Sequence, residues 1–246
     1  MAVFVLVPGA FLGAWAWEDT ARALEEQGHT VLPLTLTGLA ERADLATAET
    51  GLETHIGDIV DAVTERGLEQ VVLVAHSYGA APVTGAAGRL GDRLRAVVYV
   101  DSAPFAEGMR GLDLIPPEET ERMRKEVAEQ GGGRWLPVPP PEVLGAGSSL
   151  EGLDQEKLDL LYARATPQPF ASYEQPLPGP VEPAAGVELV LIACADFQQL
   201  LSAGIPMLAH LNEEPWRRLD LATGHWPMFS APRELAVALD QVVTRP

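Results

Sequence analysis

The feature that most constrains the fold is an apolar run that ends in a serine among small residues. Residues 71–75 read Val-Val-Leu-Val-Ala, which predicts a buried strand, and residues 76–81 read His-Ser-Tyr-Gly-Ala-Ala. Small residues around Ser77 suit a sharp turn in which a strand and a helix pass close together, with the serine hydroxyl at the carboxyl edge of a parallel sheet. Taken alone, the pattern fits a helix N-cap equally well, so it does not decide the role of Ser77.

Segments with strand and helix character alternate along most of the chain. We expect strands at 3–7, 29–34, 71–75, 94–100, 187–193 and 216–221, and helices at 17–27, 54–66, 78–90, 198–211 and 232–243. This alternation predicts an α/β fold with a doubly wound, mostly parallel sheet. A chain of 246 residues is long enough to bury one sizeable core of this kind.

The alternation stops between residues 104 and 183. This stretch holds two segments with helical periodicity, 118–129 and 154–165, separated by a glycine triplet and a proline-rich run. Long loops without secondary structure are uncommon inside domains, so we expect a helical cap or lid rather than a linker. The predicted organisation is a core formed by 1–103 and 184–246, with 104–183 inserted as the cap.

Composition excludes several classes of partner. The net charge is −18, from 17 basic and 35 acidic residues, which argues against binding to nucleic acid or to anionic membranes. Cys194 is the only cysteine, so no internal disulfide can form. The first seven residues lack a basic leader and no apolar run is long enough to span a bilayer, so we expect a cytoplasmic protein. The histidines lack metal-ligand spacing, and we expect neither a metal nor another cofactor.

A histidine near the C-terminus gives the serine a chemical context. His225 lies in the run Ala-Thr-Gly-His-Trp-Pro-Met at 222–228, between the last predicted strand and the last predicted helix. A serine on an early elbow followed by a late histidine is the chain order of the serine–acid–histidine triad of one large hydrolase fold. We therefore expect Ser77 to be a nucleophile and His225 its general base.

Four short runs carry a resemblance to a known family. They are Val-Pro-Gly-Ala-Phe-Leu-Gly-Ala-Trp at 7–15, Val-Pro-Pro-Pro at 138–141, Thr-Pro-Gln-Pro at 166–169 and Gly-His at 224–225. Together with the elbow, they make the whole chain resemble α/β-hydrolases, in particular bacterial relatives of plant methyl salicylate esterases and hydroxynitrile lyases. The resemblance implies an α/β-hydrolase fold with a cap. It also implies an oxyanion hole formed by the backbone N–H groups of Ala10 and Tyr78.

The chain departs from the family in ways that bear on its chemistry. Pro8 and Leu12 stand where the family motif has two histidines, so any substrate contact from those histidines is missing. Gly9 and Trp226 stand where the hydroxynitrile lyases have a threonine and a lysine. Since that lysine favours departure of cyanide, its absence points away from cyanohydrin cleavage and toward hydrolysis.

Two aspartates compete for the place of the triad acid. Asp196 follows the strand predicted at 187–193, in the loop where the family acid falls, and it is the preferred candidate. Asp101 ends the strand predicted at 94–100, where some α/β-hydrolases carry their acid, and it is the rival. Either carboxylate could instead be an ordinary loop residue or helix cap.

The predicted reaction is hydrolysis of a small carboxylic ester, thioester or lactone through an acyl-enzyme. Phe11 and Trp226 are the expected substrate-binding residues, because they neighbour the oxyanion segment and His225. One alternative is a biosynthetic enzyme that releases or cyclises a tethered acyl chain, with an acyl carrier protein as partner. Another is a non-catalytic receptor for a small molecule. The sequence leaves the oligomeric state open, a homodimer included.

Overall fold

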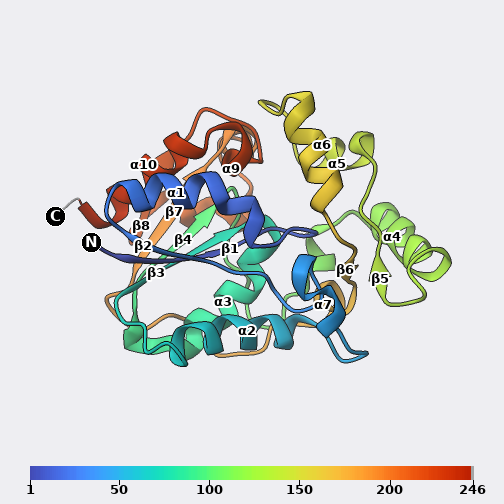
Figure 1. The fold of residues 1–246 in the computed structure, drawn as a ribbon, viewed down its shortest axis with the longest axis horizontal. Helices are drawn as coiled ribbons and strands as arrows, with labels where there is room; N and C mark the ends of the chain where they lie inside the picture. Colours follow the sequence, from blue (N-terminus) through green and yellow to red (C-terminus); the bar gives the residue numbers. More distant parts are fainter. Residues whose placement is uncertain (245–246) are drawn as a thin grey trace.

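The computed structural model describes residues 1–244, and a six-stranded parallel sheet forms the centre of this part of the chain (Figure 1). The strand order is β2-β1-β3-β4-β7-β8. The strands are β1 (Val3–Val7), β2 (Thr30–Pro33), β3 (Val71–His76), β4 (Leu94–Val100), β7 (Glu188–Ala193) and β8 (Trp216–Asp220). The predicted α/β fold with a doubly wound, mostly parallel sheet is confirmed.

Helices cover both faces of the sheet (Figure 1). One face carries α1 (Glu18–Glu26) and α10 (Pro232–Thr244), and the other carries α2 (Leu52–Thr64) and α3 (Ala80–Leu90). Successive strand residues point to opposite faces, so Phe4 and Leu6 enter one apolar cluster while Val5 and Val7 enter the other. Burial on both sides explains why β1 and β3 are continuous apolar runs rather than alternating ones.

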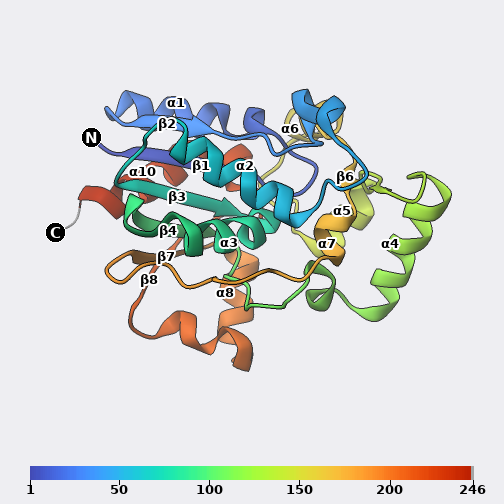
Figure 2. The same ribbon diagram turned by 90° about the horizontal axis from the view of Figure 1, so that it is seen from below.

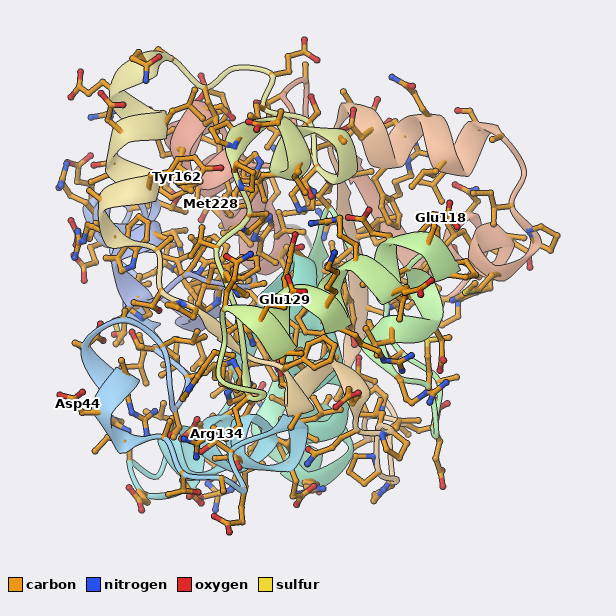
Figure 3. All side chains as sticks on the ribbon, turned by 90° about the vertical axis from the view of Figure 1, so that its right-hand side faces the viewer. Asp44, Glu118, Glu129, Arg134, Tyr162 and Met228 are labelled. Carbon is orange, nitrogen blue, oxygen red and sulfur yellow. The ribbon has the colours of Figure 1, made fainter. Side chains whose placement is uncertain are left out.

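The chain between β4 and β7 leaves the sheet and gathers at the end where the strands terminate (Figure 2). It contains α4 (Pro117–Glu129), α5 (Pro141–Gly147), α6 (Gln155–Arg164), α7 (Ala171–Glu174) and the antiparallel pair β5 (Trp135–Leu136) and β6 (Gln168–Pro169). Figure 3 looks onto this end, with Glu118 and Glu129 of α4 and Tyr162 of α6 lying across it. The boundaries that divide core from cap at 103/104 and 183/184 stay a prediction.

The cap has an apolar cluster of its own. Its buried members are Leu112, Met123, Val127, Leu136 and Phe170 from the cap, together with Phe11 from the core. The cap is therefore packed onto the loop that follows β1, next to the carboxyl edge of the sheet.

The structure differs from the expected helix at 198–211. The chain instead forms α8 (Ala195–Ser202), a turn, and a 3-10 helix (Pro206–Asn212). Gly204 has a positive φ of 68° and Pro206 supplies no backbone N–H, so the α-helix ends before them. Elements α5, β5 and β6 are too short to leave a periodic signal and were not expected. Within residues 1–244, no helix combines the length and the apolar character needed to cross a membrane.

Candidate active site

Ser77 occupies a strained turn between β3 and the helical segment that leads into α3. Its φ is +51°, a left-handed conformation that a non-glycine residue adopts at a cost. The turn is tight, because a Cβ added to Gly79 would lie 2.8 Å from the carbonyl oxygen of Pro8. The expected strand–serine–helix elbow is thus present in the backbone, with Ser77 half-buried at its apex.

The loop after β1 passes directly beside Ser77. A Cβ placed on Gly9 would lie 2.8 Å from Nδ1 of His76 and 3.2 Å from the Cβ of Ser77. Ala10 follows Gly9, and Tyr78 lies in the first turn after β3, where backbone N–H groups have no partner within the helix. The two N–H groups predicted for an oxyanion hole therefore belong to the two segments that meet at Ser77.

His225 is held by an aspartate on β4's carboxyl end. Its Nδ1–H donates a hydrogen bond to Oδ2 of Asp101 at 2.6 Å, and the Asp101 side chain is almost fully buried. The other carboxylate oxygen, Oδ1, accepts the backbone N–H of Cys194 at 2.9 Å. A proton on Nδ1 leaves Nε2 of His225 as the free basic nitrogen, which is the tautomer that a general base requires.

This geometry corrects the expected partner of His225, because the preferred candidate Asp196 does not contact it. Oδ2 of Asp196 instead accepts the backbone N–H of Ser149, a cap residue, at 3.1 Å. Asp196 lies in the first turn of α8, whereas Asp101 stands at the end of β4 with a φ of +46° and its carboxylate between His225 and Cys194. The rival candidate, Asp101, is the one that the structure places on the histidine.

His76, the residue before Ser77, fixes the backbone of the histidine loop. Its Nε2–H donates to the carbonyl oxygen of His225 at 2.8 Å, and the two imidazole rings lie 4.8 Å apart between centroids. Burial lowers the pKa of His76 to about 3, so this ring is neutral at physiological pH. The serine elbow and the His225 loop are thereby joined through one buried side chain.

The site is closed. Within residues 1–244, Nε2 of His225 is shielded from solvent and has no hydrogen-bond partner. Part of the cap lies against the same loop, since a Cβ on Gly224 would come within 2.6 Å of the carbonyl oxygen of Glu151. The cap therefore covers the loop that carries His225.

The two expected substrate-binding residues belong to different apolar clusters. Phe11 is 8% exposed, has a φ of +68° and packs into the cap cluster. Trp226 is 4% exposed, belongs to the core, and meets the ring of His225 edge-on at 5.3 Å. Contact of either residue with a substrate stays a prediction.

Sequence reasoning missed two buried polar residues near the elbow. His55 of α2 is fully buried; its Nδ1 accepts the hydroxyl proton of Tyr78 at 2.6 Å and its Nε2–H donates to the carbonyl oxygen of Thr37 at 2.9 Å. Gln168 of β6 is also fully buried, and its Oε1 accepts the N–H of Phe11 at 3.0 Å. Gln168 lies in the Thr-Pro-Gln-Pro run that carries part of the resemblance, but that run does not reveal its partner. Both contacts join segments that are distant in the chain, so the sequence could not indicate the contacts themselves.

Metal-ligating groups and the thiol of Cys194 are also relevant to the chemistry of the site. Among residues 1–244, no group of three or more histidine, cysteine, aspartate or glutamate side chains is arranged to hold a metal ion. Burial raises the pKa of Cys194 well above its ordinary value, which keeps the thiol protonated and unreactive. That the protein needs no metal or cofactor stays a prediction.

Comparison with known proteins agrees with this arrangement. The model of the alpha/beta hydrolase family matches residues 4–238. A carbendazim hydrolyzing esterase from Nocardioides sp. is 33% identical over 97% of this chain and 98% of its own length. Methylesterase 9 from Arabidopsis thaliana is 26% identical over 100% of this chain and 99% of its own. An extracellular α/β-hydrolase from a Paenibacillus species superposes with a TM-score of 0.78 over the full length of both chains at 18% identity, which shows a shared fold.

The extent of the family match and the similarity to a relative along nearly its whole length are consistent with the sheet order, the serine elbow and the late histidine. They also confirm the resemblance to the group that includes the methylesterases. This chain therefore belongs to the alpha/beta hydrolase family.

Proposed function

We propose that the protein is a serine hydrolase that cleaves a small carboxylic ester through Ser77, His225 and Asp101. The observation that carries the proposal is the 2.6 Å hydrogen bond from Nδ1–H of His225 to Asp101, which leaves a basic Nε2 without a partner. Ser77 lies at the strained elbow, next to His76. The imidazole of His76 donates a hydrogen bond to the backbone carbonyl oxygen of His225.

In the proposed first step, Nε2 of His225 removes the hydroxyl proton of Ser77 as the serine oxygen attacks the ester carbonyl carbon. Asp101 stabilises the imidazolium that forms. The negative charge that develops on the carbonyl oxygen is accepted by the backbone N–H groups of Ala10 and Tyr78. When the carbon–oxygen bond of the ester breaks, the imidazolium returns its proton to the departing alcohol, and the acyl group remains on Ser77.

In the second step, water attacks the acyl-enzyme while His225 takes a proton from it. The tetrahedral intermediate again places its oxyanion at the two N–H groups. Collapse breaks the bond between the acyl carbon and the serine oxygen, and His225 returns the proton to Ser77. The acid product leaves, and no external oxidant or cofactor enters the balance.

The comparisons indicate where to search for the substrate. Similarity along the whole chain to a carbendazim hydrolyzing esterase and to a plant methylesterase supports esters with a small alcohol part, methyl esters first. An apolar acyl part agrees with the apolar cap cluster that includes Phe11. Carbendazim itself belongs in the first panel of compounds.

The test combines turnover with labelling. Purified protein is assayed with p-nitrophenyl esters of increasing acyl length, with methyl esters and with carbendazim, and a fluorophosphonate is used to label the nucleophile. We expect turnover and labelling at Ser77, with both lost in Ser77→Ala. Labelling that persists unchanged in Ser77→Ala contradicts the proposal, whereas tight ligand binding without turnover would favour the receptor alternative.

A further inference from the structure

The cap holds the backbone of Phe11, the residue that follows the proposed oxyanion donor Ala10. The Phe11 N–H donates to Oε1 of Gln168 at 3.0 Å, and the Phe11 carbonyl oxygen accepts the N–H of Thr166 at 3.0 Å. Phe11 has a φ of +68°, a conformation that persists only when its surroundings enforce it. Both backbone groups of this strained residue are thus bound by the cap segment 166–168.

Gln168 is built into the fold rather than resting on its surface. Its side chain is fully buried, and its Nε2–H donates to Oγ of Ser172 at 3.0 Å, while that hydroxyl donates to the carbonyl oxygen of Pro169 at 2.6 Å. The amide orientation is fixed by this network, because the Phe11 N–H can only donate and must meet the oxygen. Gln168 lies in β6 and is paired with Leu136 of β5. Just before β5, the backbone carbonyl oxygen of Arg134 accepts the N–H of Phe170 at 2.9 Å.

The other proposed oxyanion donor has a comparable buried support. The Tyr78 hydroxyl donates to Nδ1 of His55, and burial raises the pKa of this tyrosine well above its ordinary value. The ring of Tyr78 also lies 5.3 Å from the ring of Tyr173, which follows Ser172, the acceptor of the Gln168 amide. The supports of the two segments that meet at Ser77 are therefore neighbours.

We propose that Gln168 is a positioning residue for the oxyanion hole. The inference rests on the proposed function. Gln168 does not touch substrate. Its Oε1 accepts the hydrogen bond of the Phe11 N–H and so holds the loop in a position that directs the neighbouring Ala10 N–H at the developing oxyanion. Because Gln168 belongs to the cap, the geometry of half of the oxyanion hole is set by an element outside the sheet.

The test compares two glutamines that make the same kind of bond. Gln168→Met keeps the side-chain volume but loses the acceptor for Phe11. Gln175→Met is the matched control, because Oε1 of Gln175 accepts the backbone N–H of Leu52 at 2.7 Å, at the start of α2. We expect Gln168→Met to lower kcat by about 10- to 100-fold with KM changed less than about threefold, since losing one donor outright costs about 10²–10³. Gln175→Met should keep wild-type kcat.

A second readout separates positioning from general loss of stability. An alkylboronic acid forms a tetrahedral adduct on the serine and samples the oxyanion hole, whereas an intact ester bound to Ser77→Ala does not require it. In Gln168→Met, boronate inhibition should weaken by the same factor as kcat/KM. Binding of the ester to the double variant with Ser77→Ala should stay within about twofold of binding to Ser77→Ala alone.

Two outcomes would overturn the role of Gln168, and a third would contradict the proposed function on which that role rests. Wild-type kcat/KM and boronate inhibition in Gln168→Met, measured well below its Tm, overturn the inference even if the Tm has fallen. Should Gln168→Met not fold, Gln168→Asn keeps the amide but draws it away from Phe11; unchanged kcat/KM and inhibition in that variant overturn it equally. A wild-type protein that neither hydrolyses esters nor reacts at Ser77 contradicts the proposed function instead.

Discussion

His225 is the residue on which most of the site depends, and three of its atoms describe its state. Its Nδ1–H donates a hydrogen bond to Asp101, and its carbonyl oxygen accepts one from His76. Its Nε2 has no hydrogen-bond partner among residues 1–244. The first two bonds orient the ring, and the third atom is available for proton transfer. Sequence reasoning predicted Ser77 and His225 from their motifs and preferred Asp196 to Asp101 as the acid. The structure places Asp101 on His225 instead, and this could not be read from the sequence because it depends on which strand end faces the histidine.

Mutation distinguishes the roles of Asp101 and Asp196. Asp101→Asn should lower kcat by about 10³–10⁴-fold, because an amide no longer holds His225 in the tautomer with a free Nε2. Asp196→Asn should leave kcat within a few-fold of wild type, since the hydrogen bond that Asp196 makes is with the Ser149 backbone and not with His225. Steady-state kinetics on the best ester checks both variants, and a severe loss of kcat in Asp196→Asn alone would contradict the geometry.

His76 should make the protein less stable in mild acid. Its folded pKa of about 3 lies below the ordinary value of 6.5, so below about pH 6.5 the unfolded chain binds a proton that the folded protein excludes. The free energy of unfolding therefore falls as pH decreases from about 6.5, by at most about 1.4 kcal/mol per pH unit for one proton.

Urea unfolding between pH 5 and 7 measures this slope. His76→Gln keeps an N–H donor for the His225 carbonyl but cannot titrate, so its slope should be shallower than that of the wild type. His210→Gln replaces an exposed histidine and should leave the slope unchanged. An identical slope in wild type and His76→Gln would rule out this assignment.

At the scale of elements, the close approach of β1 and the start of α3 creates the elbow. Gly9 and Gly79 are the contact points, where an added Cβ would meet His76 and the Pro8 carbonyl oxygen respectively. The long elements were predictable from apolar periodicity, and β4 (Leu94–Val100) matches its expected range. The short elements β5 and β6 were not, because two paired residues carry no period and form only through the cap.

Two glycine substitutions test this packing. Gly79→Ala forces a methyl group against the backbone oxygen of Pro8 at 2.8 Å and should destabilise the protein by about 1–3 kcal/mol while lowering kcat. Gly57→Ala is the matched control: it lies within α2 with open space around its Cβ, and should stabilise the protein by about 0.5–1 kcal/mol. Thermal and urea unfolding check both signs, and a neutral Gly79→Ala would refute the packing argument.

At the scale of the whole molecule, the net charge affects the stability of the folded state. With a net charge of −18, the excess acidic side chains repel one another in the folded state. The ion pairs that the structure describes are mainly at the surface, and each contributes little to the free energy of unfolding.

The fold class was predictable from the alternation of strands and helices. Contacts between distant segments, such as Gln168 with Phe11, were not, since they exist only once core and cap are packed together.

Salt should therefore raise the thermal stability. The excess of acidic over basic residues leaves a repulsion that screening weakens more than it weakens the exposed ion pairs, which each contribute little. The Tm should therefore rise between about 0.02 and about 0.5 M NaCl, as the Debye length falls below about 10 Å. Chloride is preferable to sulfate, which strengthens apolar burial by itself. A Tm that falls with NaCl would mean that the ion pairs dominate.

The buried Nε2 of His225 has a consequence for the kinetics of inactivation. If a reagent can meet the nucleophile only in molecules whose cap is displaced, the rate of covalent labelling cannot grow without limit as the reagent concentration rises. It should reach a plateau equal to the opening rate, and the plateau should be the same for reagents of different intrinsic reactivity. The apparent affinity for any ligand of the site is likewise the intrinsic affinity reduced by the open fraction.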